Sequence, residues 1–266
     1  MLSYQHAYHA GNLADIHKHG ALCVLLSRMR EKPKALTYVE THAGRGLYDL
    51  AARESRKTGE AQAGIMKSLK ADVPPKGHPY RAVIDKTRDA FGPTTYPGSP
   101  MIARILLNDD DPMHLMELHP AEFAALSEAM AGSGAHLYHR DGFEGTLALA
   151  PPPSGHPRRG LVFIDPSFEI KSEYQSTAAF VVELNQKWPE ATIVLWYPIL
   201  EAGLHGAMID TLTEAFQAKS ERLMLREVAF KERSEKHRIL GSGLVIVNAP
   251  YGVDKGLAQV ESWFSV

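Results

Sequence analysis

The sequence predicts an α/β fold built on a mostly parallel, doubly wound sheet. Apolar segments of strand length alternate along the chain with longer segments of helical character, which is the pattern of parallel strands joined by helical crossovers. Several apolar runs are continuous, as expected for strands buried on both faces. The 266 residues suffice for one large domain with an insertion.

Seven segments have strand character, and helical segments lie between most of them. The strands are expected at 35–40, 113–117, 136–139, 161–165, 192–197, 223–230 and 243–248. The helices are expected at 12–31, 100–108, 120–131, 173–187 and 203–218. Because no helical segment separates the last two strands, we expect them to pair antiparallel, so that an antiparallel last strand completes a seven-stranded sheet.

The segment from about 50 to 95 interrupts this alternation. It is polar, contains Pro74-Pro75 and Gly92-Pro93, and has helical character near 60–70 and 79–90. Proline and glycine pairs of this kind mark turns and loops. We therefore expect residues 1–266 to form one domain that carries a small helical insertion.

One expected strand ends in a distinctive tetrapeptide. The apolar run at 161–164 leads directly into Asp165-Pro166-Ser167-Phe168. Proline cannot donate to a sheet ladder, so the strand stops there, and open α/β folds bind ligands at the carboxyl ends of their strands. A carboxylate, a carbonyl and an aromatic ring suit a planar amine, which presents two N–H groups and a face for stacking. The alternative is a simple turn in which Asp165 caps a helix.

A glycine-rich turn follows the first expected strand. Thr41-His42-Ala43-Gly44-Arg45-Gly46 comes directly after Glu40, and such turns bring the backbone close to a bound nucleotide. The dinucleotide fingerprint requires a third glycine, but position 49 is Asp49. A nicotinamide-binding site is therefore disfavoured.

Acids also end two further strands. Glu117 follows the run 113–116, and Asp141 follows the strand at 136–139. A carboxylate at one strand end can bind both ribose hydroxyls of a nucleoside, and one at the next can accept from an adenine amino group. Each acid can instead be a helix N-cap, although glutamate is a poor one. The order of glycine turn, Glu117, Asp141 and Asp165 matches Rossmann-like methyltransferases that use S-adenosylmethionine.

Several motifs resemble those of one methyltransferase family. They are Met1-Leu2-Ser3-Tyr4-Gln5-His6-Ala7-Tyr8-His9-Ala10-Gly11-Asn12, Asp15, Lys18-His19, Thr41-His42-Ala43-Gly44, Tyr96-Pro97-Gly98-Ser99-Pro100, Glu117-Leu118-His119-Pro120, Asp141-Gly142-Phe143 and Trp196-Tyr197-Pro198. The matching blocks run from residue 1 to the Gly241-Ser242-Gly243 region and beyond. On these motifs the chain resembles the bacterial 23S rRNA adenine-N6 methyltransferase J (RlmJ) family over essentially its whole length.

The resemblance implies a reaction and a set of site residues. The reaction is methyl transfer from S-adenosylmethionine to the N6 amino group of an adenine in 23S ribosomal RNA, without a metal. Asp165 is the implied catalytic acid, with Pro166 supplying a carbonyl and Phe168 stacking on the base. Tyr4 is implied to contact the substrate, and Lys18 is a further candidate for that role. The cofactor-binding candidates are His19, His42, Gly44, Ser99, Glu117, Asp141, Gly142 and Asp165.

One position departs from the family pattern. The family has two prolines after the catalytic acid, whereas the second is Ser167 here. We expect slower turnover with the same chemistry. Three alternatives stay open: a DNA adenine-N6 methyltransferase, which uses the same tetrapeptide; methylation of a protein or small-molecule amine; and a non-catalytic RNA-binding relic of the fold, which Ser167 would favour.

Composition limits the class of protein and its compartment. With 29 basic and 31 acidic residues, the chain has no net positive charge that would attract nucleic acid over a broad surface. A local basic patch would still be enough to bind RNA. The single Cys23 excludes an internal disulfide and fits a reducing cytosol. No apolar stretch approaches the roughly 18 residues of a membrane span, and no signal peptide is visible. We expect a cytoplasmic enzyme with no membrane contact and no obligate protein partner.

The expected RNA is naked or partly assembled, because a base must leave its stack to reach a buried site. Two basic groups are candidates for contacting it, with solvated charged loops as the alternative. The first group is Arg53, Arg56 and Lys57, and the second is Lys231, Arg233, Lys236, His237 and Arg238. Tyr4 and Tyr8 are candidates for stacking on bases.

Histidines crowd the start of the chain. His6, His9, His17 and His19 fall within the first twenty residues. No cysteine joins them and no further carboxylate ligand is evident, so surface or capping histidines are favoured over a metal site. The resemblance separately assigns His19 and His42 to the cofactor.

Overall fold

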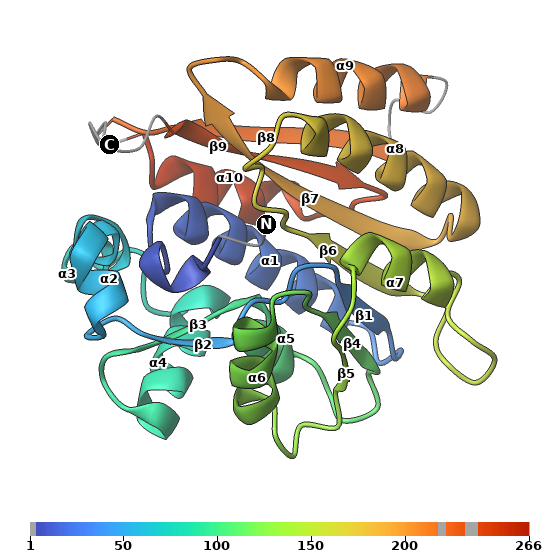
Figure 1. Cartoon of the computed structure of the whole chain (residues 1–266). Coiled ribbons are helices and arrows are strands. Elements are labelled where there is room, and N and C mark those ends of the chain that lie inside the picture. Colours follow the sequence, from blue (N-terminus) through green and yellow to red (C-terminus); the bar gives the residue numbers. More distant parts are fainter. Residues whose placement is uncertain (1–3, 218–221, 232–238, 266) are drawn as a thin grey trace.

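The computed structural model describes residues 4–217, 222–231 and 239–265. Within these residues the main sheet has seven strands in the order β5-β4-β1-β6-β7-β9-β8 (Figure 1). The strands are β1 (Thr37–Glu40), β4 (Met113–Met116), β5 (His136–Tyr138), β6 (Gly160–Ile164), β7 (Ala191–Leu200), β8 (Leu223–Ala229) and β9 (Ile239–Val247).

Strand directions in this sheet follow the predicted pattern. The five strands from β5 to β7 are parallel, and β9 is antiparallel to both of its neighbours, β7 and β8. All seven expected strands are therefore confirmed, as is the antiparallel last strand. The order places β1 in the middle of the five parallel strands, where the crossovers reverse direction, and a ligand site is expected at such a switch point.

Helices cover both faces of the sheet, as Figure 1 shows. α1 (Leu13–Arg30), α5 (Ser99–Leu106) and α10 (Asp254–Ser262) pack together on one face. α7 (Gly142–Leu149), α8 (Ser172–Lys187) and α9 (His205–Phe216) form the opposite layer, and α6 (Pro120–Ala129) lies near the edge. Every residue of β1, β4 and β6 is buried, which explains the continuous apolar run of β6 and the largely apolar character of the other two strands.

The five helices expected outside the insertion are found as α1, α5, α6, α8 and α9, whereas α7 and α10 were not expected. Both are short and contain glycine, which weakens the helical signal in the sequence. Among the described residues, no helix combines the length and the apolar character that crossing a bilayer would demand.

Helices fill the segment that interrupts the alternation. They are α2 (Arg53–Thr58), the π-helical turn η2 (Gln62–Met66), α3 (Lys67–Lys70) and α4 (Pro79–Phe91). An unexpected pair of strands, β2 (Leu47–Asp49) and β3 (Thr95–Pro97), joins antiparallel at the two ends of this segment. The chain therefore leaves and re-enters the main fold at one place, directly before α5.

Candidate active site at the carboxyl ends of the strands

A cavity of about 340 Å³ opens beyond the carboxyl ends of β1, β4, β5 and β6. It is lined by eleven of the sequence-predicted residues, namely Tyr4, Lys18, His19, His42, Gly44, Ser99, Glu117, Asp141, Gly142, Asp165 and Pro166. These residues come from seven separate stretches of the chain. This arrangement agrees with the expectation that the strand ends converge on one cavity.

Glu117 holds the glycine turn against the end of β4. Its Oε2 accepts from the Gly44 amide at 2.8 Å, and its Oε1 accepts from the His119 amide at 2.7 Å. Burial raises the pKa of Glu117, while these two amides lower it. The N-cap of α6 is His119, so Glu117 is not a helix cap. Each carboxylate oxygen keeps a lone pair for a ligand in the cavity.

Asp141 is both a helix cap and a cavity residue. Its Oδ1 accepts from the Glu144 amide at 2.9 Å, which caps α7. The other carboxylate oxygen stays available to a ligand. The next residue, Gly142, has to be a glycine, because a Cβ at this position would lie 1.8 Å from the Thr41 carbonyl oxygen. Glycine thus lets α7 approach the end of β1.

His19 and His42 are neutral at physiological pH, because burial lowers the pKa of each to about 4. The His19 Nδ1 lies 2.8 Å from the Tyr96 hydroxyl, which lies 2.6 Å from the Tyr80 hydroxyl. The His42 Nδ1 lies 2.7 Å from the Thr41 hydroxyl. In both rings one nitrogen is held by the protein, which leaves the other for a ligand.

Ser99 links the cavity to a buried acid at the end of β1. Its hydroxyl donates to Oε1 of Glu40, and the Tyr38 hydroxyl donates to Oε2 of Glu40 at 3.1 Å. Burial raises the pKa of Glu40 well above its usual value. We assigned Glu40 no role from the sequence, although it ends an apolar strand as Asp165 does. It fixes the start of α5 beneath the glycine turn.

Asp165 is held by a lysine from α1. Oδ2 of Asp165 lies 2.7 Å from the Lys18 ammonium, which also lies 3.0 Å from Oδ1 of Asp15. Lys18 is buried, and its ammonium lies 4.8 Å from the ring centroid of Trp196. Burial alone would lower the pKa of Lys18, but the facing carboxylates of Asp165 and Asp15 raise it. Lys18 is therefore charged. The N-cap of α8 is Lys171, so Asp165 does not cap that helix.

The N-terminal segment extends this network to the rim of the cavity. The other oxygen of Asp15 lies 3.0 Å from Nε2 of His6, and Nδ1 of His6 lies 2.8 Å from the Tyr4 hydroxyl. Burial alone would raise the pKa of Asp15, but His6 and Lys18 lower it well below its usual value. A continuous chain of contacts thus runs from Tyr4 to Asp165. Only the i, i+3 spacing of Asp15 and Lys18 on a helix hinted at it in the sequence.

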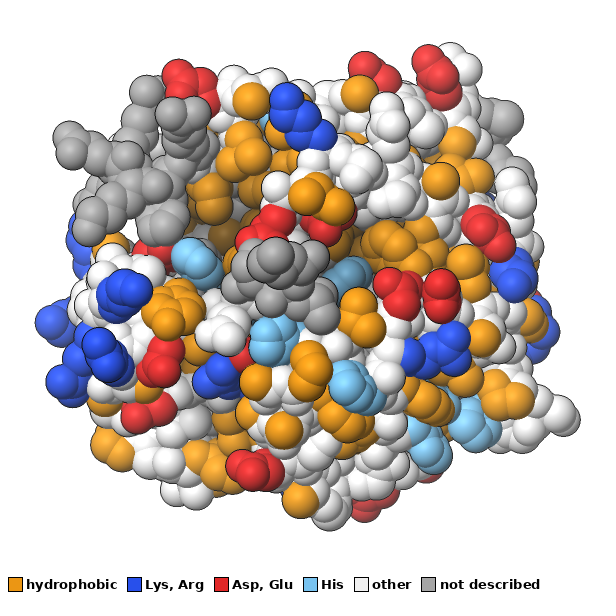
Figure 2. All heavy atoms as spheres, in the orientation of Figure 1, with side chains coloured by type: hydrophobic (Ala, Val, Ile, Leu, Met, Phe, Trp, Pro, Cys, Tyr) orange, Lys and Arg blue, Asp and Glu red, His pale blue; other side chains and the backbone are white. Residues whose placement is uncertain are grey.

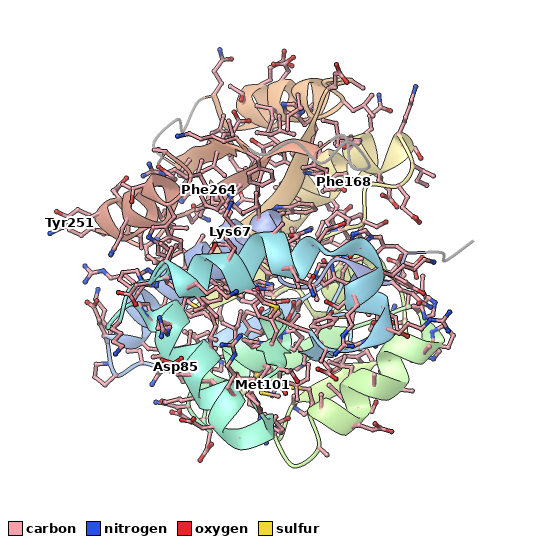
Figure 3. The ribbon with its side chains drawn as sticks, turned by 90° about the vertical axis from the view of Figure 1, so that its left-hand side faces the viewer. Lys67, Asp85, Met101, Phe168, Tyr251 and Phe264 are labelled. Atoms are coloured by element: carbon pink, nitrogen blue, oxygen red, sulfur yellow. The ribbon has the colours of Figure 1, made fainter. Side chains whose placement is uncertain are left out.

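Phe168 is the one predicted site residue that does not line the cavity. Its side chain, labelled in Figure 3, is buried. Its ring centroid lies 4.4 Å from that of Tyr174 of α8 and 6.3 Å from that of Trp196. Its backbone has a φ of +52°, which lies in the left-handed region. This geometry does not match the expected stacking of the Phe168 ring on a base. The ring is buried in an apolar cluster instead of being exposed in the cavity.

The early histidines are not surface residues. His6 and His9 are half-buried against Asp15 and Glu60, and His17 is buried with its Nδ1 2.9 Å from the Ser242 hydroxyl. Within the described part of the chain, no group of three or more histidine, cysteine or acidic side chains is arranged to ligate a metal.

The structure describes the whole of the first basic group and one residue of the second. Arg53, Arg56 and Lys57 lie on α2. Of the second group, the Lys231 ammonium donates to the Ser265 carbonyl at 3.2 Å, whereas Arg233, Lys236, His237 and Arg238 lie outside the described residues.

Known proteins are similar to this chain in sequence. A family model described as "Ribosomal RNA large subunit methyltransferase D, RlmJ" matches residues 33–266. The ribosomal RNA large subunit methyltransferase J of Escherichia coli (strain K12) is 35% identical over 266 residues, covering 99% of this chain and 92% of that protein. The protein of the same name from Haemophilus influenzae is 32% identical over 266 residues, covering 98% and 92%.

A solved structure is also similar to this chain. Protein LPL1258 from Legionella pneumophila superimposes with a TM-score of 0.84 at 30% identity, covering 96% of this chain and 94% of that one. The resemblance inferred from the motifs is therefore confirmed along nearly the whole chain. This chain belongs to the ribosomal RNA large subunit methyltransferase J (RlmJ) family.

Proposed function

We propose that this chain transfers a methyl group from S-adenosylmethionine to the N6 amino group of an adenine in 23S ribosomal RNA. The observation that most supports this reaction is that Asp165 and Pro166 line the cavity while Lys18 holds one Asp165 oxygen. A fixed anionic acceptor beside a backbone carbonyl matches the two N–H groups of an exocyclic amine.

The side chains in the cavity fit S-adenosylmethionine. Glu117 has lone pairs for two ribose hydroxyls, Asp141 has a free oxygen for the adenine amino group, and Gly44 leaves room for close approach. The neutral rings of His19 and His42, with Ser99 and the Gly142 amide nearby, offer polar contacts to the remaining groups. The acids that line the cavity also favour a cationic ligand. When bound, the cofactor supplies a methyl group already activated on a sulfonium.

Asp165 acts on the amine rather than on the cofactor. Lys18 occupies Oδ2, and Oδ1 accepts no hydrogen bond from any described residue. Oδ1 and the Pro166 carbonyl would accept the two N–H bonds of the adenine amino group. That draws the nitrogen toward a tetrahedral shape, with its lone pair aimed at the methyl carbon. The N6 lone pair forms the new bond, the sulfur keeps the electron pair of the old bond, and the surplus N6 proton passes to Oδ1.

Other side chains position the base. Tyr4 and Ile170 are exposed at the rim of the cavity, so they are suited to flank a ring that enters it. Phe168 supports this arrangement from behind, since its packing on Tyr174 fixes the loop that carries Pro166. The target adenine must leave its stack, which costs less in naked or partly assembled RNA than in a finished ribosomal subunit. We place this step in the cytoplasm.

The experiment is methyl transfer with radiolabelled S-adenosylmethionine. Its substrates are deproteinised 23S RNA from cells that lack the gene, finished large subunits from the same cells, and duplex DNA. Mass spectrometry of the digested RNA should find N6-methyladenosine in the deproteinised sample at a single position. Label on DNA alone, on a different nucleoside, or nowhere while the cofactor still binds would overturn the proposal.

A further inference from the structure

One face of α2 carries three basic side chains. Arg53, Arg56 and Lys57 are spaced i, i+3 and i+4, so they share a side of the helix, while Ser55 faces inward and is buried. All three are exposed, and none forms an ion pair with another described residue. Charges of this kind are available to an external partner.

This basic face is joined to the segment that forms the rim of the active site. α2 packs against the short helix η1 (His6–Tyr8), where the Thr58 hydroxyl donates to the Tyr8 carbonyl. The Lys57 ammonium lies 5.5 Å from the ring centroid of Tyr8. Tyr4 and His6, which precede or begin η1, line the cavity. Figure 2 shows lysine and arginine side chains gathered on this side of the molecule, over the position of α2 and α3 in Figure 1.

The cavity itself has the opposite charge. Its lining includes the acids Glu117, Glu122, Asp141, Asp165, Glu169 and Glu173. Among the described lining residues Lys18 is the one lysine or arginine, and two carboxylates already neutralise it. A base can enter such a pocket, but the phosphates on either side of it are repelled. They need a basic surface next to the mouth, and α2 supplies one.

We propose that Arg53, Arg56 and Lys57 bind backbone phosphates of the RNA that flanks the target adenine. This inference rests on the proposed function and adds a docking surface to it. Since phosphate contacts fix register without reading sequence, the α2 face would set how the RNA lies across the cavity. The overall charge of −2 is no obstacle, because the charges are separated between cavity and insertion.

The test is a triple variant, Arg53→Gln, Arg56→Gln and Lys57→Gln, in the full chain. Its matched control is Lys32→Gln, Lys34→Gln and Lys255→Gln, which removes the same charge from three exposed residues. Lys32 and Lys34 follow the far end of α1, whose 18 residues span about 27 Å, and Lys255 lies near Tyr251, whose carbonyl accepts from Arg28 at the same end. A thermal melt checks that both variants are folded.

Two measurements report on the docking surface. The KM for deproteinised 23S RNA should rise about 10- to 100-fold in the α2 variant with kcat at saturating RNA retained. In filter binding without methyl transfer, the slope of log affinity against log salt should become shallower by roughly 2 to 3. The control variant should resemble the wild type in both measurements.

An unchanged KM and salt slope in the α2 variant would overturn the docking surface, as would equal losses in the control. Filter binding separates this outcome from failure of the proposed function. A wild type that binds RNA through α2 yet transfers no methyl group would contradict the reaction and leave the docking surface standing.

Discussion

The Lys18 ammonium lies 2.7 Å from Oδ2 of Asp165, although 147 positions separate the two residues in the chain. This contact joins the N-terminal helix to the loop that carries Asp165, the proposed catalytic acid. Both side chains are largely removed from water, so losing either partner would leave an uncompensated charge. Under the proposed function, methyl transfer would depend on the docking of α1.

Replacing Asp165 with asparagine should lower kcat by about 100- to 10,000-fold, because the anionic acceptor for the amine is lost. Affinity for S-adenosylmethionine should stay close to that of the wild type, since Glu117, Asp141 and the histidines remain. Methyl transfer and calorimetry measure the two effects separately. Glu183→Gln, the same kind of change at an exposed position of α8 outside the cavity, is the control and should keep full activity. Near-normal turnover in Asp165→Asn would contradict the assigned role.

Removing the Tyr96 hydroxyl should weaken cofactor binding. Tyr96→Phe leaves Nδ1 of His19 without its partner at 2.8 Å, so the ring no longer has one fixed tautomer. We expect the dissociation constant for S-adenosylmethionine to rise about 5- to 20-fold by calorimetry. Tyr80→Phe keeps the Tyr96 contact and should have a smaller effect. Equal effects of the two variants would show that the pair acts only through packing.

A methyl group at position 142 should disturb the cavity. In Gly142→Ala the new Cβ would lie 1.8 Å from the Thr41 carbonyl oxygen, so α7 must move away from β1. We expect a loss of about 1 to 3 kcal/mol in the free energy of unfolding, together with weaker cofactor binding. Gly206→Ala in α9 is the control, because its Cβ meets no atom within 4 Å, and it should be neutral or slightly stabilising. Denaturant titration distinguishes the two.

Restoring the family's second proline should not harm the enzyme. The Ser167 amide donates no hydrogen bond within the described residues, so Ser167→Pro sacrifices no contact there. We expect kcat to be retained or raised, because the proline stiffens the loop beside Pro166. Steady-state methyl transfer measures it. A clear loss of activity would show that the serine is adapted to a different loop geometry.

Stability should fall as the solution becomes acidic. Burial lowers the pKa of His17 to about 3 and that of His19 to about 4, whereas an unfolded histidine titrates near pH 6.5. Between these values the unfolded chain binds more protons than the folded one, so the free energy of unfolding declines as pH drops. Each histidine contributes at most about 1.4 kcal/mol per pH unit. Urea midpoints from pH 7.5 to 5 measure the decline, which His17→Gln should reduce. A flat profile would contradict this account.

The strands and their ends were predictable because they depend on local sequence. An apolar run that is followed by an acid is informative by itself. This applies to β6 with Asp165, and to β4 with Glu117, whose run is interrupted only by His114. The family motifs supplied most of the remaining cavity residues. In contrast, β2 and β3 have three residues each, too few for a periodic pattern to emerge.

Contacts between distant segments were not predictable. The pairing of Lys18 with Asp165, and of Ser99 with Glu40, depends on how α1 and α5 pack against the sheet. The direction of the Phe168 ring also depends on tertiary packing, since Tyr174 competes with the cavity for it. An aromatic residue beside a catalytic acid is equally compatible with either role until the fold is known.

The pairing of β2 with β3 has a consequence for how this enzyme can change over time. Neighbouring strands lie about 4.8 Å apart, so everything between Asp49 and Thr95 begins and finishes at almost the same point. Charge at the exposed positions between those residues can vary without shifting the turn at Gly44 or the start of α5. The buried positions are constrained, because the Tyr80 hydroxyl lies 2.6 Å from that of Tyr96 and α4 packs against α1. Relatives with other RNA targets can thus be sought, or constructed, through exchange of the exposed side chains of this one segment while its buried contacts are kept.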